Sequence, residues 1–200
     1  MSDGDAGGDG TPPDPSTPPH RLVAGTAAID DLDAFLAALD EIAGETGAVV
    51  QAFDADLVVS AAHLREATRL AARSIARGEA VARDPGVEIM LYAAGSRQID
   101  RALTLGVEAG EQRAVVLVAE FGAGPGAGRS DADLDAAAAS VAALLSSPTA
   151  PVAERGAFDS SFDPERVREF YDIGEREIAA TAGGIPDIVR ERVALLDVEK

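Results

Sequence analysis

The sequence predicts a single α/β domain, with a mixed central sheet of about four to five strands flanked by helices. Short, valine-rich apolar segments alternate along the chain with longer segments whose apolar residues recur at helical spacing. An alternation of strands and helices is typical of layered α/β domains. The length of 200 residues and the hydrophobic content of 46% fit one domain of this kind.

Four segments have the composition of strands. Segments 87–94 (VEIMLYAA) and 113–121 (RAVVLVAEF) are almost continuously apolar, which is typical of central strands covered on both faces. Segment 47–53 is short and contains β-branched residues, and segment 20–28 provides the first strand. We therefore expect the sheet to be built mainly from these four segments.

The remaining ordered segments have helical features. In segment 30–45 the apolar residues recur at helical spacing, and acids fill the first turn, where the helix dipole favours them. Ser130 is placed to cap a helix over 130–145, and Pro186 stands at the first position of the last helix. Further helices are expected at 61–77, 97–105, 164–171, 174–180 and 186–198, and a short helical piece at 79–83 precedes the turn Asp84-Pro85-Gly86.

Residues 1–19 are expected to form a disordered acidic tail rich in Pro and Gly. Met1 and Ala6 are its only apolar side chains outside proline. Such a composition cannot bury enough surface to offset the entropy of ordering the chain. The α/β domain is accordingly expected over residues 20–200.

Composition restricts the class of protein. The chain has no cysteine and only His20 and His63, which excludes a thiolate or histidine-rich metal site. No apolar run reaches the ~18–20 residues that span a bilayer, and the first residues lack the features of a signal peptide, so we expect a cytoplasmic protein without a membrane partner. The net charge is −18, with 16 arginines and one lysine, a balance similar to that of proteins from salt-loving archaea.

One part of this acidic chain is basic. Seven of the 17 basic residues lie within residues 63–101, where only five acids occur. On a helix over 61–77, a row of arginines falls opposite a stripe of apolar and small residues: Arg65, Arg69, Arg73 and Arg77. A solvated face would explain such a row, but solvated faces elsewhere in this chain carry Asp and Glu. Because arginine binds phosphates, bases and carboxylates through bidentate and stacking contacts, the other interpretation is a face that binds a partner.

The turn Gly95-Ser96-Arg97-Gln98 follows a predicted strand and opens a predicted helix. Its backbone N–H groups and Arg97 suit a bound anion. The same geometry suits a plain strand-to-helix connection with Ser96 as the N-cap. A small phosphate-binding enzyme that uses this turn is one alternative function, although no convincing nucleophile, base or metal set accompanies it. No cofactor is expected.

A combination of motifs resembles one protein family. The motifs are His63-Leu64, Glu88-Ile-Met-Leu-Tyr92, Gly95-Ser-Arg-Gln-Ile99 and Glu191-Arg-Val-Ala-Leu-Leu-Asp197. Together they are similar to the kinase-binding subunit of the KEOPS complex, the TPRKB family, over about residues 20–198. This chain carries Arg where members from low-salt organisms often carry Lys, which fits a haloarchaeal-like member.

The resemblance implies a regulatory subunit without catalytic residues of its own. It implies binding to the small protein kinase/ATPase of KEOPS, and through it to the remaining KEOPS subunits, in support of threonylcarbamoyladenosine modification of tRNA. It also implies contact with the single-stranded 3′ end of tRNA. The candidate nucleic-acid-binding residues are His63, Arg65, Arg69, Arg73, Arg97 and Gln98. The face that binds the kinase stays open, and a homodimeric structural module is a further alternative.

Overall fold

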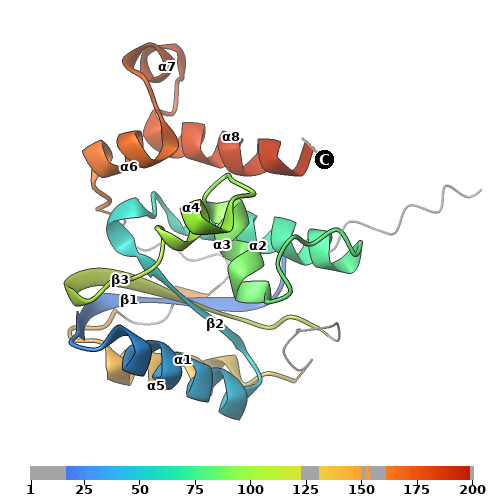
Figure 1. The fold of residues 1–200 in the computed structure, drawn as a ribbon, viewed down its shortest axis with the longest axis vertical. Coiled ribbons are helices and arrows are strands. Elements are labelled where there is room, and N and C mark those ends of the chain that lie inside the picture. The colour runs from blue at the N-terminus through green and yellow to red at the C-terminus, as the bar shows by residue number, and fades with distance from the viewer. Residues whose placement is uncertain (1–16, 123–130, 150–151, 154–160, 199–200) are drawn as a thin grey trace, which may run out of the picture.

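The computed structural model describes residues 17–122, 131–149, 152–153 and 161–198, and shows one α/β domain with a sheet between two layers of helices (Figure 1). The sheet has the order β2-β3-β1-β4. Its strands are β1 (His20–Ile29), β2 (Val49–Asp54), β3 (Gly110–Ala119) and the two-residue β4 (Val152–Ala153). The predicted α/β class is confirmed.

The details of the sheet differ from those expected. Every strand pair in the described part of the chain is antiparallel, so the sheet there is not mixed. Strand β3 pairs along its length with β1, from His20 opposite Ala119 to Ile29 opposite Gly110, and β2 pairs with the other edge of β3. Among the described residues, only three strands are longer than two residues, and the expected count of four to five is not confirmed.

The missing strand is a helix. Segment 87–94 belongs to α3 (Pro85–Ala93) and its C-cap Ala94, and the N-cap Asp84 accepts a hydrogen bond from the Val87 N–H at 3.0 Å. Pro85 occupies the first turn, where its lack of an N–H costs nothing. Almost every residue of α3 is buried. A buried helix produces the same continuous apolar run as a central strand, because no side of it faces water.

The sheet separates two apolar cores, and β3 shows how. Its residues alternate between them: Ala114, Val116 and Val118 pack on one side, and Val115 and Leu117 on the other. The helices α1 (Leu32–Thr46) and α5 (Leu134–Leu144) cover the first side (Figure 1). The helices on the other side are α2 (Ala61–Ala76), α3 and α4 (Ile99–Leu103), and α6 (Pro164–Tyr171) and α8 (Ile185–Val198) lie farther from the sheet and contribute apolar residues to the same core.

Several boundaries move for identifiable reasons. Segment 79–83 is not helical, because the Glu88 carboxylate accepts the N–H groups of Val81 and Ala82 at 3.0 and 2.9 Å. Helix α5 begins after Asp133, whose side chain caps it. The predicted cap Ser130 lies outside the described residues.

The predicted tail also falls mostly outside the described part of the chain, since the description begins at residue 17. Pro18 is buried against the domain, and the carbonyl oxygen of Pro19 accepts a hydrogen bond from the Glu120 N–H at 2.9 Å. These contacts belong to the folded domain.

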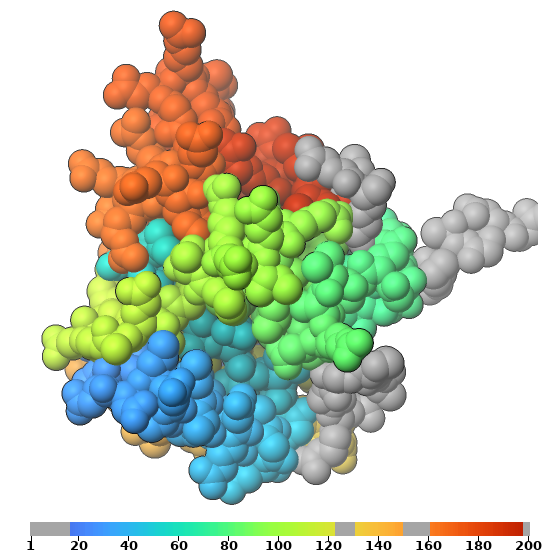
Figure 2. Space-filling view, in the orientation of Figure 1, coloured from blue at the N-terminus to red at the C-terminus, as the bar shows by residue number. Residues whose placement is uncertain are grey.

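Helix α7 (Glu175–Ala180) projects from the rest of the molecule and buries none of its residues (Figures 1 and 2). Arg192 Nη2 lies 3.0 Å from each carboxylate oxygen of Glu177, and this contact ties the projection to α8. Within the described residues, no helix has the length and apolar character needed to cross a membrane.

Candidate functional site

Helix α2 places Arg65, Arg69 and Arg73 on the side opposite its buried stripe, as the helical spacing predicts. All three residues are partly buried. Arg69 makes two hydrogen bonds to Glu66, one turn before it, at 2.7 Å from Nη2 and 3.0 Å from Nε. The side chain of Arg69 is 26% exposed. The arginine row is therefore half buried, and Glu66 on the same helix compensates the charge of Arg69. It differs in this from a fully solvated helix surface.

Two of the predicted arginines meet the end of helix α8. Arg73 Nη1 lies 3.4 Å from Asp197 Oδ2, and the Tyr92 hydroxyl donates to Asp197 Oδ1 at 3.4 Å. Arg97 Nη2 donates to the carbonyl oxygen of Leu196 at 3.0 Å. Side chains from α2, from α3 and from the turn before α4 thus converge on one turn of α8.

The turn around Gly95 joins two helices, α3 and α4, instead of a strand and a helix. Gly95 has φ +57°, and a Cβ added there would lie 3.2 Å from Arg192 Cβ. Ser96 Oγ accepts from the Gln98 N–H at 3.2 Å, and Gln98 is the N-cap of α4 without a side-chain cap bond. The turn is packed against α8, which favours the structural connection over the anion site.

His63, the first of the predicted nucleic-acid contacts, is fully buried. Its Nε2 lies 2.9 Å from the Ala93 carbonyl oxygen, to which the Tyr171 hydroxyl also donates at 2.9 Å. Burial lowers the pKa of His63 to about 4, although the hydrogen bond to Ala93 acts in the opposite direction. Burial likewise raises the pKa of Tyr171. The imidazole therefore joins α2 to α3 and α6 as a neutral interior group, and this position does not expose it to a partner.

Helix α4 carries an apolar pair at the surface. Ile99 and Leu103, one turn apart, are 44% and 51% exposed. Arg101 Nη2 donates to the Phe170 carbonyl oxygen at 2.5 Å, and its guanidinium lies 5.5 Å from the Phe170 ring centre. Leu195 of α8 is a further exposed apolar residue, with 47% of its surface accessible. It precedes Leu196, whose carbonyl oxygen accepts the hydrogen bond from Arg97. In Figure 2 the yellow-green segment that carries α4 lies on the face toward the viewer, next to the orange and red segments of α6 to α8.

Exposed apolar side chains that lie together at the surface are a feature of protein-docking surfaces. The sequence matches the family of kinase binding protein CGI-121 over residues 33–197. The chain belongs to the CGI-121 family. The resemblance to the kinase-binding subunit of KEOPS is thereby confirmed. No curated protein matches the sequence.

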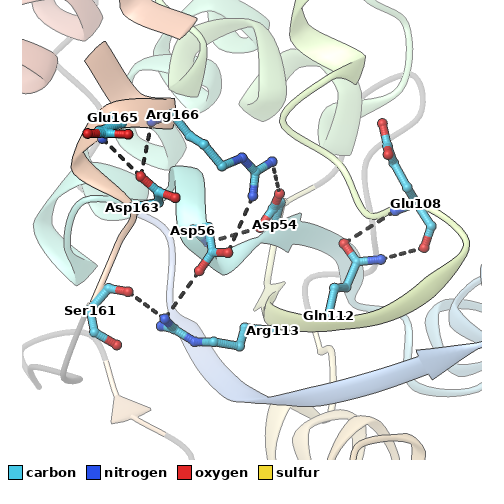
Figure 3. Close-up of polar contacts among 9 residues, drawn as sticks. All are labelled: Asp54, Asp56, Glu108, Gln112, Arg113, Ser161, Asp163, Glu165 and Arg166. Atoms are coloured by element: carbon cyan, nitrogen blue, oxygen red, sulfur yellow. Dashed lines mark hydrogen bonds and ion pairs between the residues drawn. The ribbon is translucent and has the colours of Figure 1, made fainter. Parts of the chain in front are cut away.

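The CGI-121 match extends from α1 to α8 and so includes a polar network that fixes α6 (Figure 3). Arg166 Nη2 lies 2.6 Å from Asp54 Oδ2, and Nη1 lies 3.3 Å from Asp56 Oδ2. Arg113 approaches Asp56 from β3 at 3.2 Å. Partial burial lowers the pKa of Arg166. The hydrogen bond and charge of Asp54 act in the opposite direction, as do the charges of Asp56 and Asp163, and the pKa of Arg166 is raised overall. The network anchors the helix whose Phe170 supports α4.

Sequence reasoning did not find the apolar pair of this CGI-121 protein. Ile99 and Leu103 have the same spacing as core residues, and the neighbouring Ala102 and Leu105 are indeed buried. Only the position of α4 at the surface of its layer distinguishes the two pairs. The contacts of Asp197 were equally unpredictable from the sequence, because its partners Arg73 and Tyr92 lie more than 100 residues earlier in the chain.

Proposed function

We propose that this CGI-121 protein is a non-catalytic regulatory subunit of the KEOPS complex. It binds the small protein kinase/ATPase of that complex and the 3′ end of tRNA, and so supports threonylcarbamoyladenosine modification of tRNA. The observation that carries the proposal is the family match, whose description names kinase binding. A saline cytoplasm as the site of action belongs to the same proposal and is supported by the acidic, nearly lysine-free composition.

The surface proposed to meet the kinase is the exposed side of α4, with Ile99 and Leu103 at its centre, and Leu195 of α8 is a further exposed apolar side chain. Each of these side chains is about half exposed. If a partner covered the apolar area that is still exposed, each residue would contribute on the order of 1 kcal/mol to the free energy of binding. Because α4 is held by Arg97 and Arg101, it requires little reordering when a partner binds.

The surface proposed to meet tRNA is the arginine face of α2, formed by Arg65, Arg69 and Arg73, together with Arg97, which meets the same turn of α8 as Arg73. Gln98 begins α4 beside this region and stays a candidate, whereas buried His63 is supported only as a structural residue. In molar salt the Debye length is about 3 Å, so long-range attraction of tRNA is screened. Short bidentate and stacking contacts, for which arginine is suited, would then supply the binding.

The experiment that tests the whole proposal is reconstitution. The purified chain is mixed with the other KEOPS subunits, and threonylcarbamoyl transfer to tRNA is measured. The chain alone should transfer nothing, and transfer by the other subunits should rise when the chain is added. Transfer by the chain alone, or no effect of adding it, would contradict the proposal. For the tRNA contact, equal binding of intact tRNA and of tRNA without its 3′-terminal nucleotides would contradict a 3′-end site.

The alternatives have less support. For a phosphate-binding enzyme at the Gly95–Gln98 turn, the Arg97 guanidinium would have to leave the Leu196 carbonyl oxygen that it contacts. For a homodimeric module, the α4 face would have to bind a second copy. Sedimentation of the chain alone separates this case from the proposal, because a dimer that dissociates when Ile99 and Leu103 become aspartate would favour the homodimer.

A further inference from the structure

The last turn of α8 has an unfavourable charge arrangement within its own sequence. A helix C-terminus carries partial negative charge on its free carbonyl groups, and basic side chains there are stabilising. Residues 195–198 (LLDV) contain no basic residue, and Asp197 adds a negative charge. The side chain of Asp197 is only 10% exposed, so little water reaches it. In the described part of the chain, its carboxylate meets side chains from α2 and α3.

The compensation comes from the arginines that the nucleic-acid proposal needs. Arg73 meets Asp197 Oδ2 at 3.4 Å, and Arg97 donates to the Leu196 carbonyl oxygen at 3.0 Å. The Tyr92 hydroxyl holds the second carboxylate oxygen of Asp197. A carboxylate and a helix-terminal carbonyl are the same kind of acceptor for a guanidinium as a phosphate oxygen. A phosphate that binds Arg73 would therefore have to displace the Asp197 carboxylate from the guanidinium.

We propose that the last turn of α8, through Asp197, competes with the phosphates of single-stranded RNA for Arg73 and Arg97. The proposal rests on the tRNA binding proposed above and adds its regulation. RNA that takes the two arginines leaves the end of α8 without its compensating charges, so the last turn loosens. Coupling of this kind is reciprocal, since whatever fixes the last turn must weaken RNA binding by the same factor.

The test compares the RNA affinity of two variants of the full chain, each of which removes one negative charge from α8. Asp197→Asn weakens the contact with Arg73. Glu191→Gln is the control, because Glu191 is exposed and makes no ion pair in the described part of the chain. Each protein is titrated at fixed salt with a single-stranded RNA of the tRNA 3′-terminal sequence. We expect Asp197→Asn to bind this RNA about two- to fivefold more tightly than Glu191→Gln, the range expected for a partly exposed ion pair.

Hydrogen exchange provides a second readout. Wild-type backbone amides near residues 194–197 should exchange faster when the RNA is bound, and Asp197→Ala should already show the faster exchange without RNA. If wild type binds the RNA, equal affinities of Asp197→Asn and Glu191→Gln, or unchanged exchange, would overturn the competition alone. If none of the proteins binds the RNA, the proposed tRNA function fails and the competition fails with it.

Discussion

Arg101 of α4 joins Phe170 of α6 in two ways. Its guanidinium donates to the Phe170 carbonyl oxygen at 2.5 Å and lies 5.5 Å from the centre of the Phe170 ring. That carbonyl belongs to the last turn of α6, where helix carbonyl groups lack an intrahelical partner and a cation is favourable. A helix of five residues such as α4 has little stability of its own. Its orientation therefore depends on contacts of this kind.

Replacing Arg101 by alanine should weaken kinase binding without unfolding the domain. The expected loss of affinity for the KEOPS small kinase is about three- to tenfold, because one charge-assisted hydrogen bond that orients α4 is removed. The thermal midpoint should change little, since Arg101 is exposed. Arg176→Ala on the projecting α7 removes a similar exposed charge and serves as the control. Kinase affinity that is equal in the two variants would contradict the role of Arg101.

Stability should fall as the pH drops below about 6.5, in part because of His63. The folded-state pKa of His63 is lowered from its ordinary value of 6.5 to about 4. Between these values the unfolded chain binds a proton that the native imidazole does not, so stability rises with pH in this window. The contribution of His63 is fully present above pH 6.5 and is lost progressively toward pH 4, on the order of 3 kcal/mol in total.

The measurement for His63 is the free energy of unfolding in urea at fixed salt, at pH 7 and pH 5. Because the many carboxylates also titrate, the comparison is between wild type and His63→Gln. The variant should be less stable at pH 7 but should lose less stability between the two pH values. Identical pH dependence in both proteins would show that the histidine is not buried in its neutral form.

Gly95→Ala should destabilise the domain by about 1–2 kcal/mol. The left-handed backbone, with φ +57°, disfavours a side chain, and the new Cβ would lie 3.2 Å from Arg192 Cβ. Gly44→Ala, in the interior of α1 with open space around it, should instead stabilise the domain by up to about 1 kcal/mol. Denaturant unfolding of both variants checks the opposite signs. A shift in the same direction for both would refute the packing of Gly95 against α8.

The sequence was sufficient where local signals agreed. The spacing of Leu64, Ala67 and Ala71 predicted α2 and its buried stripe, and these residues are buried in the structure. The valine-rich segment 113–121 predicted β3, because β-branched residues and a short length agree with a strand.

The errors arose where a local pattern had two solutions. Segment 87–94 was continuously apolar, and only its start distinguished a helix from a strand. Asp84 and Pro85 were interpreted as a turn, although the same pair is a helix N-cap followed by a first-turn proline. The predicted helical piece at 79–83 failed for a tertiary reason, since a buried glutamate from α3 takes its backbone donors.

The candidate site was only partly predictable. Helical phase placed the arginine row, because that depends on the sequence of α2 alone. It could not show that Arg73 and Arg97 meet α8, since those contacts join residues about 100 or more positions apart. The exposure of Ile99 and Leu103 likewise depends on where α4 lies in the assembled layer.

The most direct test of kinase docking is calorimetric titration of the KEOPS small kinase with three forms of the chain. They are wild type, Ile99→Asp with Leu103→Asp on α4, and Leu36→Asp with Leu144→Asp on α1 and α5. The second pair is 41% and 38% exposed on the other side of the sheet and adds the same charge. The α4 variant should lose more than about tenfold in affinity, as expected for the centre of an interface, while the control should bind like wild type. Equal affinity of all three forms, or a loss in the control alone, would contradict docking through α4.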